Sequence, residues 1–253
     1  MAREPRSFGV EAIVLRHSDF GEADRIVTLY TRQLGKTRAI VKGARKVASR
    51  KAGHLEPFTQ VKLQLAKARD IPLITQADTV AAYLPLRESL ELTGQTSYVI
   101  ELLDRFTYDE GVGNPVLFEL LTATLGRLAS HIDPWLAIRY YEMRLLDQLG
   151  FRPKLFECAH CGREIVAENQ FFSYSAGGVI CPSSARTEPD LRPISVEALR
   201  YLRHFQRSRF EDASRARPSA EAAQETEGIM QGYFAYLLER ELKTPGFLRQ
   251  IRD

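Results

Sequence analysis

Five short β-strand patterns follow one another within the first eighty residues, and no long helical pattern separates them. Apolar and β-branched residues favour strands at 8–16, 25–31, 36–42, 58–66 and 71–80. A sheet of five short strands has two exposed edges unless it closes on itself. We therefore expect a small closed barrel, of which the oligonucleotide-binding (OB) barrel is the five-stranded case.

After about residue 82 the hydrophobic period becomes helical. We predict five helices, which begin at Pro85, at Pro115, after Asp133 as an N-cap, after Ser195 as an N-cap and at Ser219. The stretch between the third and fourth helices breaks this pattern and holds all three cysteines. The predicted fold class is α+β: a five-stranded OB-type barrel (1–81), then an all-helical domain (82–150 and 194–253) with an inserted zinc-ribbon-like element (151–193).

Residues 25–53 carry nine Lys or Arg residues and no Asp or Glu. The whole chain has 35 bases and 32 acids, so the rest of it carries 26 bases against 32 acids. Such a run of like charge is easiest to tolerate where a polyanion binds, and phosphates are the obvious polyanion. The alternative is a solvated basic loop without a ligand. The candidate DNA contacts are Lys36, Arg38, Lys42, Arg45, Lys46, Arg50 and Lys51.

The candidates on the third strand share one parity, so a regular strand points Lys36, Arg38 and Lys42 to one face. Three aromatic residues of the barrel are candidates for stacking on unpaired bases: Phe20, Tyr30 and Phe58. The alternative for each of them is the barrel core, since a small barrel needs large side chains.

The cysteines predict a metal site with three evident ligands. Cys158 and Cys161 form a Cys-x-x-Cys pair, and 19 residues separate them from Cys181. A zinc ribbon needs such a pair, a spacer of about 15–20 residues and a second pair. Here Ser184 stands at the fourth position, and a neutral hydroxyl is a poor zinc ligand. Either the site has decayed, or another group completes it: His160, Glu188, Asp190 or His204.

Two stretches carry a resemblance to a known family: EAIVLRHSDFGEADRIVTLYTRQLGKTRAIVKGARK and PWLAIRYYEMRLLDQLGFRP. The shorter pieces CAHCG and ICPSS agree with them, as does the order of barrel, helices, cysteine pair and helices. Over nearly its whole length the chain resembles the RecO family of bacterial recombination mediators. It departs from that family at Ser184, where zinc-bearing members have cysteine.

The resemblance implies binding to single- and double-stranded DNA, annealing of complementary strands, and partnership with RecR. It also implies help in loading RecA onto strands coated by single-stranded DNA-binding protein (SSB), whose C-terminal tail the family contacts. A basic rim for that tail is expected on the helices, with four candidates: Arg127, Arg139, Arg144 and Arg203.

Annealing needs no chemical step, so we expect no enzymatic activity and no cofactor beyond one structural zinc ion. No apolar run approaches the ~20 residues that cross a bilayer, and the first ten residues lack an apolar signal core. We therefore expect a cytoplasmic, nucleoid-associated protein without a membrane partner. The alternatives are a metal-dependent nuclease and a protein–protein adaptor without DNA affinity. The scattered acids argue against the nuclease, because nucleases gather carboxylates around metal ions.

Overall fold

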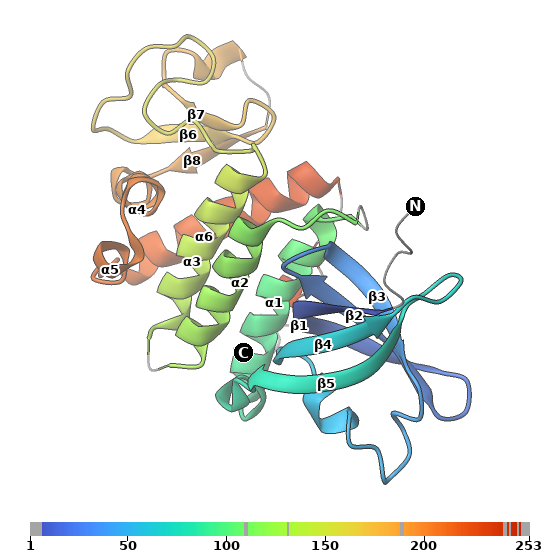
Figure 1. Ribbon diagram of the computed structural model, residues 1–253. Helices are drawn as coiled ribbons and strands as arrows, with labels where there is room; N and C mark the ends of the chain where they lie inside the picture. The colour runs from blue at the N-terminus through green and yellow to red at the C-terminus, as the bar shows by residue number, and fades with distance from the viewer. Residues whose placement is uncertain are drawn as a thin grey trace. The chain divides into compact units, whose positions relative to one another are not determined.

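The chain forms two compact units, Met1–Ser130 and His131–Asp253, called here the N-terminal and the C-terminal unit. The computed structural model describes residues 7–108, 111–130, 132–187 and 190–239, with residues 242, 244–246 and 248 (Figure 1). Among these residues, no helix combines the length and the hydropathy of a membrane-spanning segment. The domain division expected from the sequence stays a prediction.

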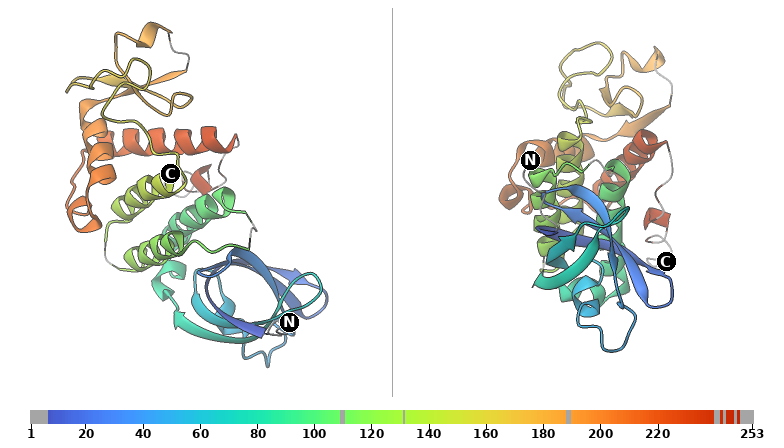
Figure 2. Two further views of the ribbon diagram at one scale, coloured as in Figure 1. Left: turned by 45° about the horizontal axis from the view of Figure 1, so that its top comes forward. Right: turned by 45° about the vertical axis from the view of Figure 1, so that its right-hand side comes forward.

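Five strands of the N-terminal unit close into a barrel: β1 (Ser7–Phe20), β2 (Asp24–Thr31), β3 (Gly35–Val41), β4 (Gln60–Ala66) and β5 (Leu73–Ala81). Their order is β1-β2-β3-β5-β4, and β4 pairs back to β1, as the ring in the left view of Figure 2 shows. The parallel seam between β3 and β5 is narrow, with one pair, Ile40↔Leu73, and a 2.9 Å hydrogen bond from the Ile40 amide to the Pro72 carbonyl. The structure thus confirms the α+β class and the N-terminal five-stranded barrel.

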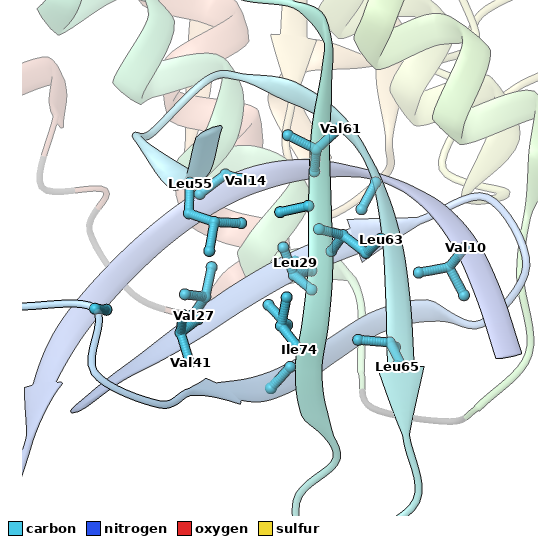
Figure 3. Close-up of a cluster of buried hydrophobic side chains, with 14 residues drawn as sticks. Val10, Val14, Val27, Leu29, Val41, Leu55, Val61, Leu63, Leu65 and Ile74 are labelled. Carbon is cyan, nitrogen blue, oxygen red and sulfur yellow. The ribbon is translucent and has the colours of Figure 1, made fainter. Parts of the chain in front are cut away.

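Alternating side chains fill the barrel (Figure 3). In β4, Val61, Leu63 and Leu65 are all buried, whereas Lys62 between them is exposed. Leu55 from the 3-10 helix η1 (Ala52–Leu55) joins the same cluster. Each fully buried Val or Leu stabilises the fold by about 1.5–3 kcal/mol, so the period-two pattern decides which face of each strand turns inward.

The helical part of the N-terminal unit comprises the 3-10 helix η2 (Leu84–Arg87) and the helices α1 (Leu90–Phe106) and α2 (Pro115–Leu128). The predicted helix from Pro85 is therefore divided. Pro85 opens the 3-10 turn, and Ser89 then caps α1 by accepting a hydrogen bond from the Leu92 amide at 3.0 Å. A Ser hydroxyl offers this bond to a helix terminus, so the new helix begins there.

The linker between α1 and α2 is fastened to the barrel within the same unit. The Gly113 amide donates to the Gln33 carbonyl in the β2–β3 turn at 3.0 Å. A Cβ at Gly113 would collide with the carbonyl oxygen of Arg32, so the two backbones approach this closely only because residue 113 is glycine.

The C-terminal unit contains helices and a small sheet, and the bounds of its elements are α3 (Pro134–Gln148), β6 (Gln170–Ser173), β7 (Gly178–Ile180), η3 (Ala185–Thr187), β8 (Leu191–Ile194), α4 (Val196–Arg207), α5 (Phe210–Ala213) and α6 (Ala220–Leu238). The sheet order is β7-β6-β8. The N-caps predicted at Asp133 and Ser195 are confirmed, because each side chain accepts a hydrogen bond from an amide of the first helical turn. Ser219, predicted as the start of the last helix, is the N-cap of α6 in the same way.

Candidate nucleic-acid interface and metal centre

Lys36 lies on the outer face of β3, since Ala39 and Val41 of the same strand point into the barrel core. Its ammonium nitrogen is 2.8 Å from Oδ1 of Asp104 in α1, and it donates to the carbonyls of Asp104 and Thr107 at 2.7 and 3.1 Å. The Lys36 side chain is only 17% exposed. This cation therefore holds α1 against the barrel and is not presented to a phosphate.

In the folded chain, acids that lie outside the basic segment in the sequence form ion pairs with its cations. Lys42 Nζ lies 2.8 Å from Oδ2 of Asp24, whose other oxygen accepts the Gly43 amide at 2.8 Å. The hydrogen bond from Lys42, followed by that from Gly43, lowers the pKa of Asp24. Arg45 Nε is 3.4 Å from Oδ2 of Asp19. A segment that is free of acids in the sequence is thus not an acid-free surface.

The basic loop, residues 43–51, carries two exposed cations without an ion pair in the described residues. Lys46 and Arg50 are exposed, and neither forms an ion pair within the described part of the chain. Lys51 is half-buried, with Nζ donating to the Ile74 carbonyl at 3.1 Å. Arg38 is exposed on the outer face of β3. Of the seven predicted contacts, Lys46 and Arg50 are the best placed to meet phosphates, and the DNA-binding set stays a prediction.

The three aromatic candidates fall into two classes. Tyr30 and Phe58 are core residues, 2% and 6% exposed, which is the alternative that the sequence left open. Burial raises the pKa of Tyr30 to about 12. Phe20, the last residue of β1, is 44% exposed. Of these three rings, only that of Phe20 is presented to solvent.

The three cysteines meet in the C-terminal unit, with their sulfur atoms all within 4.8 Å of one another. The Sγ atoms of Cys161 and Cys181 are 3.7 Å apart, and Cys158 Sγ accepts the amides of both residues at 3.5 and 3.4 Å. Hydrogen bonds from Ser184 and then Arg163 lower the pKa of Cys161 to about 5. Thiolates at these distances form a cluster that can hold one metal ion.

The fourth ligand position faces hydroxyl groups. Ser184 is buried, and its Oγ lies 3.4 Å from Cys181 Sγ. No His, Asp or Glu among the described residues joins the three sulfurs, which removes His160 and Asp190 from the candidates. His204 hydrogen-bonds instead to Ser208 Oγ and the Asp212 carbonyl, and Glu188 lies outside the described residues. The set of three soft thiolates and one open position suits zinc.

The prediction that Arg139 belongs to an exposed basic rim is wrong. Its side chain is 3% exposed and lies 2.7 Å from Glu142 Oε1, which is also fully buried. Arg144 and Arg203 donate to backbone carbonyls of the C-terminal unit, so both stabilise its fold. Helical spacing alone does not separate such arginines from surface ones. The i,i+3 pair of Arg139 and Glu142 is equally compatible with a helix surface, and the carbonyls bound by Arg144 and Arg203 lie 62 and 48 residues away in the sequence.

Comparison with known proteins decides the family. The sequence profile described as "Recombination protein O N terminal" matches residues 6–83, and that described as "Recombination protein O C terminal" matches residues 87–245. This chain belongs to the RecO family. A protein named DNA repair protein RecO from Roseiflexus sp. is 39% identical over 98% of this chain and 87% of its own length. Relatives of the same name from Dehalococcoides mccartyi and Bacillus pumilus are 35% and 32% identical, over 98% and 96% of this chain and 98% and 94% of their own lengths.

The resemblance stated from the sequence is confirmed by these matches. Membership of the RecO family supports a role in DNA repair and recombination. The basic loop lies within the region that matches the N-terminal RecO profile.

Proposed function

We propose that this RecO-family chain binds DNA, anneals complementary single strands and, with RecR, helps load RecA onto SSB-coated strands during recombinational repair. The observation that carries the DNA-binding part is the basic loop 43–51, with Lys46 and Arg50 exposed and without ion pairs in the described part of the chain. Cations of this kind neutralise phosphates and release counterions without reading the base sequence.

Annealing follows from that binding without a chemical step. Two complementary strands repel each other through their phosphates, and a basic surface lowers this repulsion as they approach. Base pairing then supplies the driving force. We therefore propose a non-enzymatic protein that acts on single- and double-stranded DNA in the cytoplasm, at the nucleoid. RecR and the C-terminal tail of SSB are its proposed protein partners, and the family resemblance supports both.

We also propose one structural zinc ion held by Cys158, Cys161 and Cys181, with the hydroxyl of Ser184 or a water molecule completing the tetrahedron. Such an ion ties together the chain segments that provide its ligands. Hydrogen bonds from Ser184 and Arg163 lower the pKa of Cys161, and those from Ser183 and Ser184 lower the pKa of Cys181, so both residues favour the thiolate, which is the form that binds metal.

A strand-annealing assay without magnesium tests the proposal. Two complementary oligonucleotides with a fluorophore and a quencher should pair faster with the wild-type chain than without protein. A Lys46→Ala/Arg50→Ala variant should lose most of this acceleration, whereas a variant at a solvent-facing lysine of β4, Lys62→Ala, should keep it. Cutting that appears only when metal is added would favour the nuclease, and neither annealing nor cutting would favour the adaptor.

A further inference from the structure

Phe20 is an exposed aromatic residue at a hairpin that is otherwise polar. It ends β1, and in the register with β2 it lies opposite Asp24. Asp24 in turn binds Lys42, the residue that follows β3. The Phe20 ring, 44% exposed, is therefore presented at the same end of the β1–β2–β3 sheet from which the basic loop leaves.

The basic loop is bonded directly to this hairpin. The Arg45 amide donates to the Ala23 carbonyl at 2.9 Å, and its guanidinium donates to the Glu22 carbonyl at 3.3 Å and lies 3.4 Å from Asp19. Val47, two residues further along the loop, is fully exposed. The hairpin and the loop thus form one surface, in which Asp19 and Asp24 pair with cations and an aromatic ring accompanies exposed cations.

We propose that Phe20 stacks on an unpaired base of a strand whose phosphates lie on the basic loop, so that this surface selects single strands over duplex. The inference rests on the proposed DNA binding and names the feature of DNA that the site recognises. An aromatic ring beside a basic groove is the usual device for holding single strands, because every base has a face to stack on. In a duplex those faces are covered by neighbouring base pairs, so the ring gains nothing there except at an end.

Charge decides between DNA and an apolar protein partner for the ring. An exposed Phe alone would suit either. Lys46 and Arg50, on the loop bonded to the Phe20 hairpin, are exposed and form no ion pair within the described residues, and they suit a ligand that carries regularly spaced anions beside planar apolar groups. Single-stranded DNA has both features.

The test compares Phe20→Ala, Phe20→Leu and Phe20→Trp by fluorescence anisotropy on three ligands of equal length: a thymidine oligomer, an abasic oligomer and a duplex. Loss of one stacked base should weaken binding of the thymidine oligomer by about 5- to 150-fold in Phe20→Ala. Phe20→Leu, which keeps an apolar side chain but no ring, should show a similar loss, and Phe20→Trp should bind as the wild type does. Binding to the abasic oligomer and the duplex should not change.

Val80→Ala is the matched control, since Val80 lies on β5 of the same barrel and is 47% exposed. It should leave all three affinities unchanged. Equal losses of Phe20→Ala and Phe20→Leu on thymidine and abasic oligomers would overturn the inference, as would unchanged DNA binding together with lost binding to RecR. Wild-type protein that binds no DNA at all would instead remove the proposed function itself.

Discussion

Replacing Lys46 and Arg50 together with Ala should flatten the salt dependence of DNA binding, and replacing Lys36 with Met should not. The three side chains all belong to the basic segment of the sequence, but the fold treats them differently. Lys46 and Arg50 are exposed without ion pairs in the described residues, whereas Lys36 is 17% exposed and bound to Asp104.

The expected magnitude follows from counterion release. Each phosphate contact on a single strand contributes about 0.7 to the slope of log affinity against log salt concentration. Two lost contacts should therefore flatten the slope by about 1.4, and over a tenfold rise in salt the wild-type chain should lose about 25-fold more affinity than the double variant.

Lys36→Met provides the contrast in stability. The change leaves the Asp104 carboxylate and the carbonyls of Asp104 and Thr107 without their common donor. Because these groups are partly buried, the free energy of unfolding should fall by about 1–3 kcal/mol while the salt slope stays at the wild-type value.

Anisotropy titrations of a labelled thymidine oligomer at several salt concentrations give the slopes, and thermal melts of the same preparations give the stabilities. If Lys36→Met flattened the slope and the loop variant did not, the assignment would be reversed: the outer face of β3, and not the loop, would meet the phosphates.

The remaining predictions concern the C-terminal unit. Ser184→Cys supplies a fourth thiolate, so the protein should retain zinc against a chelator for longer; equal zinc content in both proteins by mass spectrometry would show that Ser184 is not at the ligand position. In metal-free protein the pKa of Cys161 is lowered to about 5, so its thiolate should react with iodoacetamide at neutral pH, and the reaction should slow only as the pH falls toward 5. The same lowered pKa means that the stabilisation from this thiolate is fully present above 9.0, the ordinary pKa of a thiol, and is lost as the pH falls through about 5. Urea titrations across that range would measure the loss. In α6, Gly228→Ala should raise the free energy of unfolding by up to about 1 kcal/mol, since no atom lies near the new methyl group. Gly232→Ala should lower it by about 1–3 kcal/mol because its methyl group would collide with the Tyr174 hydroxyl, and melts that ranked the two variants in the opposite order would contradict this packing.

Patterns that depend on neighbouring residues were enough to predict the barrel strands and most of the helix starts. The alternation in 58–66 gives β4, and the side chains of Asp133, Ser195 and Ser219 mark helix starts because each bonds an amide two or three residues ahead. The break at Ser89 was missed, since Pro85 is an equally good first helical residue and the choice between them depends on how η2 packs.

The site was harder to predict, because its electrostatics depend on pairs distant in the sequence. Asp104 lies 68 residues after Lys36, and no local pattern indicates that the two meet. Asp24 borders the basic segment, but only the pairing of β2 with β3 brings its carboxylate to Lys42. The cysteine spacing succeeded where the charge pattern did not. The Cys158–Cys161 pair is set by a short turn, in which the Cys161 amide donates to Cys158 Sγ, and only Cys181 has to be brought in from 23 residues away.

The single-pair seam between β3 and β5 has a consequence for how this protein responds to a ligand. β1 pairs with β4 along the whole of β4, whereas β3 and β5 pair only at Ile40 and Leu73. Local opening of the barrel should therefore begin at the seam between β3 and β5. The loop that leaves β3 reaches across to β5 through Lys51 and the Ile74 carbonyl. A polyanion that lies along that loop and binds only the barrel with a closed seam would keep the seam closed. Binding of the polyanion and closure of the seam would then favour each other by the same factor.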